Sequence, residues 1–162
     1  MPGDEIVPVA SFSATRAITI AAPPERVWPW IVQVGFGRAG FYSYDLLDNL
    51  GRPSADCILP DCQAVQVGDW VPMASKVSET TAFKVKAFEP NQWLIWDKPD
   101  STWVWKLEPL TGGRTRLITR LKQYHDWKSP AGTVLTVILA EFGDFAMMRK
   151  MLLGIKARAE KI

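Results

Sequence analysis

The chain has 162 residues, of which 48% are hydrophobic and 22% charged, and its formal net charge at pH 7 is +2. This composition excludes a disordered or fibrous chain, and a chain of this length buries roughly 70% of its unfolded surface without metals or disulfides as staples. We therefore expect one globular domain over residues 1–162, with residues 1–12 as a flexible arm. The balanced charge, without a run of five like charges, argues against nucleic acid as a partner.

Other classes are excluded by what the sequence lacks. The longest apolar stretch, residues 134–140, is far shorter than the ~20 residues that span a bilayer, so we expect no stable membrane insertion. Cys57 and Cys62 are too few for a secreted disulfide framework and suit a reducing, cytoplasmic compartment, although a bridge between them stays an alternative. The lone His125 excludes a multi-histidine metal site, and we expect neither a metal nor a bound cofactor.

The first part of the chain predicts one strand and two short helices. Residues 13–21 alternate between apolar and polar side chains, which is typical of a half-buried strand. A proline pair at 23–24 then favours a helix through about Val34, bent at Pro29. After a glycine-rich loop, residues 41–51 place apolar side chains at helical spacing and predict a second helix.

The middle of the chain predicts an antiparallel meander. Residues 52–67 are irregular, and the strands that follow are expected at 69–73, 82–88, 92–96, 102–108 and 115–123. The last two are joined by a hairpin loop at 109–114. Trp93 and Trp96 lie on opposite faces of one strand, and the sequence leaves open which of them points inward.

The last 30 or so residues change to a helical period. From residue 131 onward, apolar side chains recur at intervals of three, four or seven, which predicts one long helix. The chain is therefore expected to be an α+β protein, in which this helix covers the apolar face of an antiparallel sheet of about six to seven strands.

This order of elements resembles the helix-grip fold of the SRPBCC superfamily, which includes START-like, polyketide cyclase and birch-pollen-allergen-like proteins. The segments that carry the likeness are APPERVWPWIVQVG at 22–35, GFYSYDLLDNL at 40–50, QVGDWV at 66–71, TWVWKLEPLTGGRTRLITR at 102–120 and the terminal helix. The GFYSYD segment is similar to that of a largely uncharacterised bacterial branch. The resemblance implies a curved sheet wrapped round the terminal helix, with an elongated apolar cavity between them.

Such a cavity implies a small hydrophobic ligand of the lipid, polyketide or aromatic type, held without a cofactor. The side chains that would line it come from the second predicted helix, from two neighbouring strands and from the terminal helix: Tyr42, Tyr44, Trp103, Trp105, Leu117, Thr119, Ile138, Phe142 and Phe145. The tryptophans and their strand neighbours share the faces opposite to the charged residues. An ordinary filled core explains the same pattern and stays open as the alternative.

Four residues are candidates for acid–base chemistry. Tyr44 could donate a hydrogen bond to a substrate carbonyl while Asp45 accepts a proton, as an aldol cyclase or dehydratase requires. Glu141 lies beside the apolar stripe of the terminal helix, where desolvation would raise its pKa. His125 follows the last strand near the expected cavity mouth. Each also has a structural interpretation, as an anchor, a surface carboxylate or a loop histidine.

Binding of a small hydrophobic molecule is thus the first functional hypothesis. A cofactor-independent enzyme of the polyketide cyclase or dehydratase kind is the second, and a protein-interaction module similar to co-chaperone members of the superfamily is the third. The apolar segment 147–154 could pack on the sheet or on a second copy, so a monomer and a homodimer are both left open.

Overall fold

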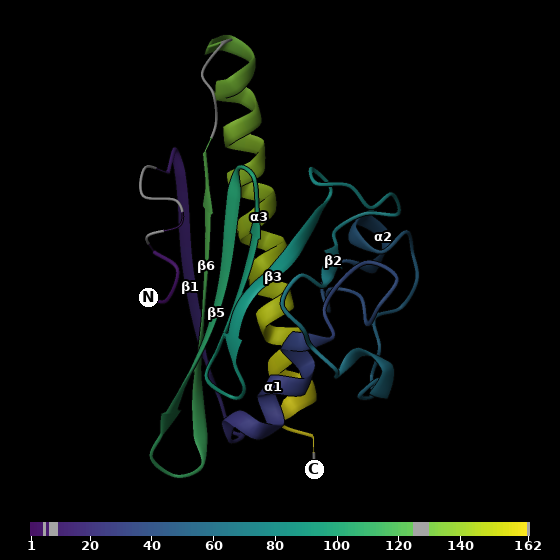
Figure 1. Ribbon diagram of the computed structural model, residues 1–162, viewed down its shortest axis with the longest axis vertical. Coiled ribbons are helices and arrows are strands. Elements are labelled where there is room, and N and C mark those ends of the chain that lie inside the picture. Colours follow the sequence, from purple (N-terminus) through teal and green to yellow (C-terminus); the bar gives the residue numbers. More distant parts are fainter. Residues whose placement is uncertain (5, 7–9, 125–129, 162) are drawn as a thin grey trace.

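The computed structural model describes residues 1–4, 6, 10–124 and 130–161, and it describes side chains for all of these except 130–144. Its sheet is antiparallel and has six strands in the order β1-β6-β5-β4-β3-β2 (Figure 1). The strands are β1 (Phe12–Ile20), β2 (Trp70–Pro72), β3 (Ala82–Glu89), β4 (Trp93–Lys98), β5 (Ser101–Leu110) and β6 (Arg114–Gln123). The predicted α+β class and the meander are confirmed.

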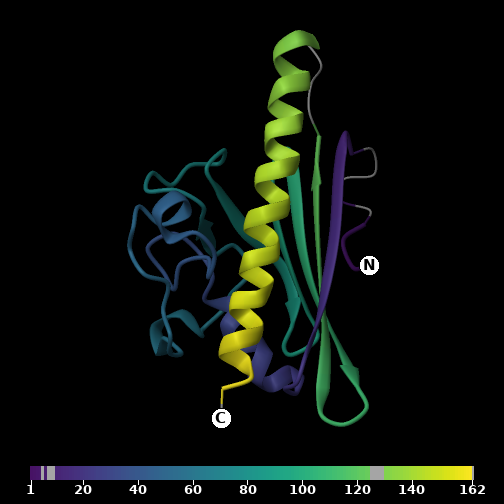
Figure 2. The ribbon, with the colours of Figure 1, turned by 180° about the vertical axis from the view of Figure 1, so that it is seen from behind.

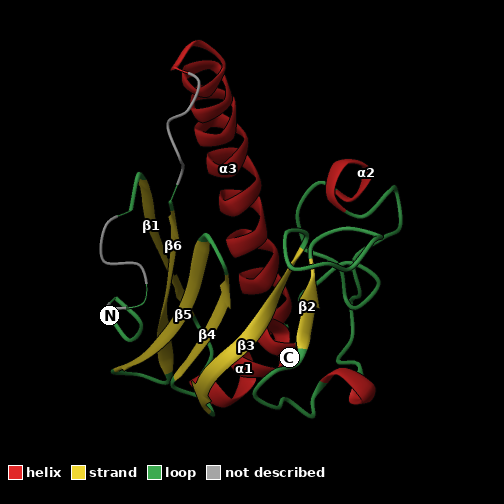
Figure 3. Ribbon diagram, turned by 45° about the horizontal axis from the view of Figure 1, so that its top comes forward, coloured by secondary structure: helices red, strands yellow, loops and turns green. Residues whose placement is uncertain are grey.

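A long helix, α3 (Pro130–Ala159), crosses one face of this sheet (Figures 2 and 3). Its first turns extend past the ends of the strands, and its second half contacts β1 and α1 (Pro24–Val32). The side chains of this half that are buried are Met148, Met151, Leu152, Ile155 and Ala159. No helix in the described part of the chain is both long and apolar enough to cross a membrane.

Three tryptophans fill the centre of the space between sheet and helix. Trp96 of β4 lies directly opposite Trp103 of β5 in the register, and their ring centroids are 5.4 Å apart in an edge-to-face arrangement. Trp105 packs against both, at 5.6 Å from Trp96 and 5.0 Å from Trp103. The inward residue of β4 is therefore Trp96, which is fully buried, while Trp93 lies on the opposite face.

The second predicted helix is much shorter than its apolar spacing suggests. Only α2 (Asp45–Asp48) is helical, because Tyr42 and Leu50 on either side of it have φ angles of 55° and 50°. A left-handed residue breaks the helical hydrogen-bond ladder, so the apolar spacing of residues 41–51 does not produce one helix. The segment 41–44 forms an ordered turn, and its position matters for the site described below.

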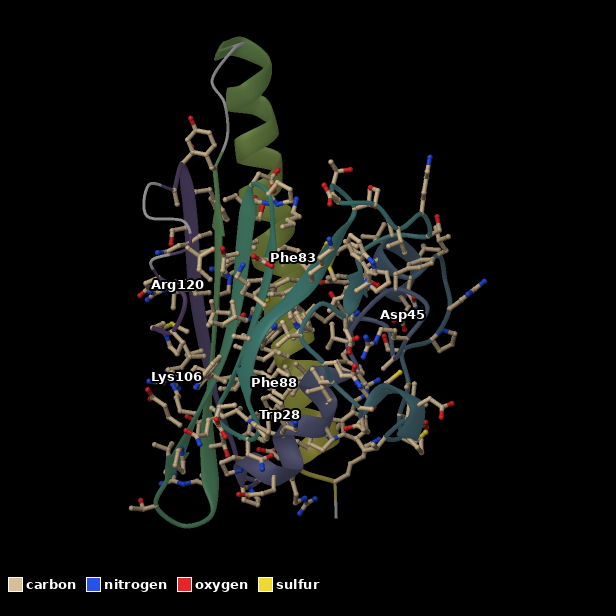
Figure 4. The ribbon with its side chains drawn as sticks, viewed as in Figure 1. Trp28, Asp45, Phe83, Phe88, Lys106 and Arg120 are labelled. Carbon is tan, nitrogen blue, oxygen red and sulfur yellow. The ribbon has the colours of Figure 1, made fainter. Side chains whose placement is uncertain are left out.

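The outer face of the sheet is partly covered by the first residues of the chain. Gly3 lies against Ile95 and Val104, and Asp4 forms ion pairs with Arg120 at 2.7 Å and with Lys122 at 3.3 Å. Arg120 lies on the β1 and β6 side of the molecule, away from the loops around α2 (Figure 4).

At the other end of the sheet, α1 is held to β3 by aromatic contact. Trp28 and Phe88 lie together (Figure 4), with ring centroids 6.4 Å apart. Pro29 stands inside α1, as expected from the sequence.

Candidate functional site

A pocket of about 420 Å³ lies between α3 and the loops around α2. Its volume falls within the range of roughly 300–1,000 Å³ that is usual for small-molecule sites. The described residues that line it are mostly aromatic, thioether and aliphatic: Phe36, Phe41, Ser43, Leu47, Asp48, Leu50, Met73, Ala74, Ser75, Trp103, Met147, Met148 and Met151. Leu47 and Leu50 are about 70% exposed, so the pocket opens to solvent beside α2.

The floor of the pocket is fixed by a close approach between α3 and the 41–43 turn. A Cβ atom at Gly154 would stand 2.3 Å from the carbonyl oxygen of Tyr42, so only glycine allows this contact. Gly40 is similarly required, because a Cβ atom there would lie 2.6 Å from Oγ of Ser54. These contacts hold Phe41 and Ser43, the two residues that flank Tyr42, in the pocket wall.

Tyr42 itself points away from the pocket into a buried polar cluster. Its hydroxyl donates to the carbonyl of Trp30 at 3.1 Å and accepts from Nε2 of Gln33 at 2.9 Å. Gln33 is fully buried, and its Oε1 accepts hydrogen bonds from the amide of Leu59 and from Nε2 of Gln63. Burial raises the pKa of the Tyr42 phenol far above its ordinary value, so the phenol stays protonated and holds the loops together.

Asp48 is the charged residue of the described pocket wall. Both of its carboxylate oxygens are buried, and neither has a hydrogen-bond partner among the described residues. The Ser43 hydroxyl nearby donates to the carbonyl of Met147 instead, and the Asp48 amide donates to Tyr44. Burial raises the pKa of Asp48, and the negative charge of Asp45 raises it further. The Ser43 hydroxyl and the backbone amides of Tyr44 and Asp48 approach the carboxylate without reaching hydrogen-bond geometry, and they lower the pKa by less.

Tyr44 and Asp45, the two acid–base candidates of this segment, lie outside the described pocket wall. The Asp45 carboxylate accepts a hydrogen bond from Ser54, whose Oγ in turn accepts one from the amide of Tyr42. Tyr44 is 41% exposed, and Nζ of Lys150 lies 3.8 Å from its ring centroid. In Figure 4 Asp45 lies among the loops around α2.

Solved structures with the same arrangement of sheet and helix are known, although their sequences are distant. The aromatase/cyclase Zhui from Streptomyces sp. R1128 superposes with a TM-score of 0.54 at 15% identity, over 92% of this chain and 93% of that one. Protein Q2Y8N9_NITMU from Nitrosospira multiformis gives 0.53 at 14% identity, over 93% and 97% of the two chains, and protein MLL2253 from Mesorhizobium loti gives 0.51 at 15%, over 93% and 100%. The chain therefore has the α+β helix-grip fold that the sequence resemblance implied. No protein-family model and no curated protein matches its sequence.

Within this helix-grip fold, the residues named from the sequence occupy different places. Trp103 lines the pocket, and its indole Nε1 donates to Oγ1 of Thr119 at 2.8 Å. Trp105 and Leu117 are fully buried in the core and are not among the described wall residues. Phe145 is 56% exposed and lines a separate hollow of about 210 Å³ against β1, under the guanidinium of Arg16.

For four of the residues named from the sequence, the structure describes no side chain. His125 lies outside the described residues. Ile138, Glu141 and Phe142 are described only as backbone of α3, so their side chains also lie outside what the structure describes. Among the residues that are described, no group of three or more His, Cys, Asp or Glu side chains could hold a metal ion.

Sequence reasoning missed most of the pocket wall, Asp48 above all. Asp48 directly follows Leu47 and lies four residues after Tyr44, so a helical projection over 41–51 puts it at the edge of the apolar stripe. That edge position was the available signal. Met147, Met148 and Met151 of α3 gave no such signal in the sequence, because methionines at these positions fit equally well into an ordinary core.

Proposed function

We propose that this protein binds a small molecule with an apolar body in the pocket beside α2. The observation that carries the proposal is the wall itself: a space of about 420 Å³ whose described wall consists mostly of phenylalanine, tryptophan and methionine residues. Methionine is unbranched and polarizable, so a wall rich in it adapts to ligands of varied shape. The largely exposed leucines at the rim leave a way in from solvent.

The expected affinity is moderate. A two-ring aromatic probe buries roughly 250 Å² of its own apolar surface, which corresponds to about 6 kcal/mol at 25 cal/mol per Å². That value corresponds to a dissociation constant in the range of about 10–100 µM. Naphthylethanol is a suitable neutral probe, because it combines such a ring system with one small polar group.

The test blocks the pocket and compares a matched variant. Ala74 is a half-buried residue of the pocket wall, and Ala74→Trp places an indole in the space. Ala146 is exposed on α3 outside the described wall, so Ala146→Trp makes the same change elsewhere. Naphthylethanol binding is measured by isothermal titration calorimetry, and native mass spectrometry shows whether a molecule copurifies with each protein.

The proposal expects binding to the unmodified protein and to Ala146→Trp, and a loss of at least about tenfold in Ala74→Trp. Equal binding by all three proteins would place the probe elsewhere and overturn the proposal. The same conclusion would follow if the unmodified protein bound no probe and copurified with no molecule.

A cyclase or dehydratase activity is a second candidate. It is favoured by the carboxyl of Asp48, whose pKa is raised by burial toward the range in which a carboxyl works as a general acid or base. The Streptomyces aromatase/cyclase has the same fold at 15% identity, which supports the candidate by analogy only. It predicts turnover of a polyketide-like substrate by the unmodified protein and at least about hundredfold less by Asp48→Asn. Equal turnover by the two proteins would exclude Asp48 from the chemistry.

A further inference from the structure

Three leucines beside the pocket mouth are largely exposed to solvent. Leu46, Leu47 and Leu50 are 79%, 71% and 69% exposed, and Tyr44 next to them is 41% exposed. Leu47 and Leu50 also line the pocket, but Leu46 is not a described wall residue, so a small-molecule site gives Leu46 no reason to be apolar. Single exposed leucines are ordinary on protein surfaces, whereas a group of them marks an interaction site.

The backbone of this leucine turn, residues 44–50, holds its side chains outward at a cost. Leu50 has a φ angle of 50°, and Gly51 after it one of 77°. A left-handed backbone is unfavourable for leucine, and burial of the Leu50 side chain does not offset that cost. In Figure 3, α2 stands at the outer edge of the molecule, away from the sheet. The leucines therefore project from a turn at the edge of the molecule.

The exposed charges around the leucine turn are positive. Nζ of Lys150 lies 3.8 Å from the ring centroid of Tyr44, Arg52 is exposed just after the turn, and Lys76 is exposed just after the 73–75 loop of the pocket wall. Such cations attract anionic lipid headgroups.

The two carboxylates of the leucine turn face the protein instead. Asp45 accepts a hydrogen bond from Ser54, and both carboxylate oxygens of Asp48 are buried. Neither presents its charge at the exposed side of the turn, so the side that carries the leucines is complementary to an anionic surface.

A bilayer surface fits these features better than a folded partner does. A second protein would need a matching hollow for each projecting leucine, whereas the boundary between headgroups and acyl chains accepts apolar side chains without one. Tyrosine is also enriched at that level of a bilayer. The turn is far too short to cross a bilayer, so the contact is peripheral and reversible.

We propose that the leucine turn docks on an anionic lipid bilayer and that the pocket takes its ligand from there. In the docked state the three leucines lie among the ends of the headgroups, and the basic side chains contact the lipid charges. Because Leu47 and Leu50 belong to the turn and to the pocket wall, the mouth opens directly toward the apolar layer. The route of the ligand rests on the proposed function, whereas the docking does not.

The experiment measures co-sedimentation with vesicles of phosphatidylcholine alone and with vesicles in which about one third of the lipid is phosphatidylglycerol. Leu46→Ser removes the most exposed leucine, and Leu110→Ser makes the same change in the β5–β6 hairpin, at the opposite end of the molecule (Figure 1). Lys76→Gln and Arg114→Gln form the matching pair for charge. None of the four is a described wall residue, so naphthylethanol titration checks that each variant keeps its fold and its pocket.

We expect the unmodified protein to bind the anionic vesicles at least about tenfold more tightly than the neutral ones. Leu46→Ser should weaken binding to the anionic vesicles at least about fivefold and Lys76→Gln about threefold, whereas the two hairpin variants should bind like the unmodified protein. All four variants should bind naphthylethanol equally.

Three results would contradict this reasoning. Failure to bind the anionic vesicles, or an equal loss in Leu46→Ser and Leu110→Ser, would overturn the docking and leave the proposed function standing. A dimer in sedimentation velocity that Leu46→Ser dissociates would assign the turn to a second copy of the chain and overturn the docking likewise. Vesicle binding by proteins that bind no naphthylethanol and copurify with no molecule would overturn the proposed function and the route of the ligand, and would leave the docking.

Discussion

The contact between Gly154 and the 41–43 turn gives the sharpest test of how this site is built. In an unobstructed helix, Gly→Ala raises stability by about 1 kcal/mol, because alanine has the higher helix propensity. At Gly154 the added Cβ would lie 2.3 Å from the carbonyl oxygen of Tyr42 and 2.7 Å from its Cβ. Both distances are more than 0.5 Å below ordinary contact, so α3 and the turn would have to separate.

The magnitude follows from what such a separation disturbs. Met151 and Ile155 are buried on the same stretch of α3, and overpacking of a well-packed core costs roughly 1–3 kcal/mol or more. Because the clash is with rigid backbone, the upper part of that range applies, and the gain in propensity offsets only about 1 kcal/mol. We expect Gly154→Ala to lower the free energy of unfolding by about 2 kcal/mol, and the melting temperature by about 4–8 °C for a chain of this size.

The assay is thermal and urea unfolding followed by circular dichroism, with Ala146→Gly as the reference. Ala146 is exposed on the same helix, so its substitution measures propensity alone and should cost about 1 kcal/mol. A Gly154→Ala variant that is as stable as the unmodified protein, or more stable, would show that the close approach does not exist in solution. The account of the pocket floor would then be wrong.

Three further changes test other parts of the structure. Asp48→Asn should raise the unfolding free energy of the ligand-free protein by about 1 kcal/mol in urea titrations at pH 7, because it removes a charge that burial disfavours. Since burial raises the pKa of Asp48, the unmodified protein should gain stability as the pH falls through that pKa toward the ordinary value of an aspartate, and the variant should lack this gain. Asp4→Asn should lower the free energy of unfolding by about 0.5–1 kcal/mol at pH 7. The amino terminus and Arg120 hold the pKa of Asp4 well below its usual range. In urea titrations across pH, the difference in stability between the two proteins should therefore be complete above about pH 5 and shrink as the pH falls below 4. Thr119→Val removes the acceptor of the buried Trp103 indole N–H and should cost about 1–2 kcal/mol, whereas Thr119→Ser, which keeps the hydroxyl, should cost less in the same titrations.

The elements that sequence patterns predicted well are those whose partners lie close in the chain. Strands β5 and β6 alternate strictly and are joined by a three-residue turn at 111–113, so their pairing follows from local sequence. The long helix follows from its apolar period in the same way. Long-range contacts instead determine the backbone of residues 41–51, where the apolar spacing of a longer helix is present but only Asp45–Asp48 is helical.

At that segment, two distant residues determine the backbone. Gly154 admits the Tyr42 carbonyl against α3, and Ser54 Oγ accepts from the amide of Tyr42 at 2.9 Å, which holds Tyr42 in its left-handed conformation. These partners are 112 and 12 residues away, so no window of local sequence contains both. The same limit explains why most residues of the pocket wall were not predicted, since the wall comes from the 36–50 loop, the 73–75 loop, β5 and α3.

The position of the pocket follows from how the tryptophans of β4 and β5 pack. The resemblance implied a cavity between the sheet and the terminal helix, lined in part by Trp103 and Trp105, yet Trp96, Trp103 and Trp105 pack on one another and fill the space under the middle of the sheet. Of these three, Trp103 alone reaches the described wall, so the aromatic core ends where the pocket begins. The pocket therefore lies at one edge of the aromatic core, between α3 and the loops around α2, rather than under the middle of the sheet.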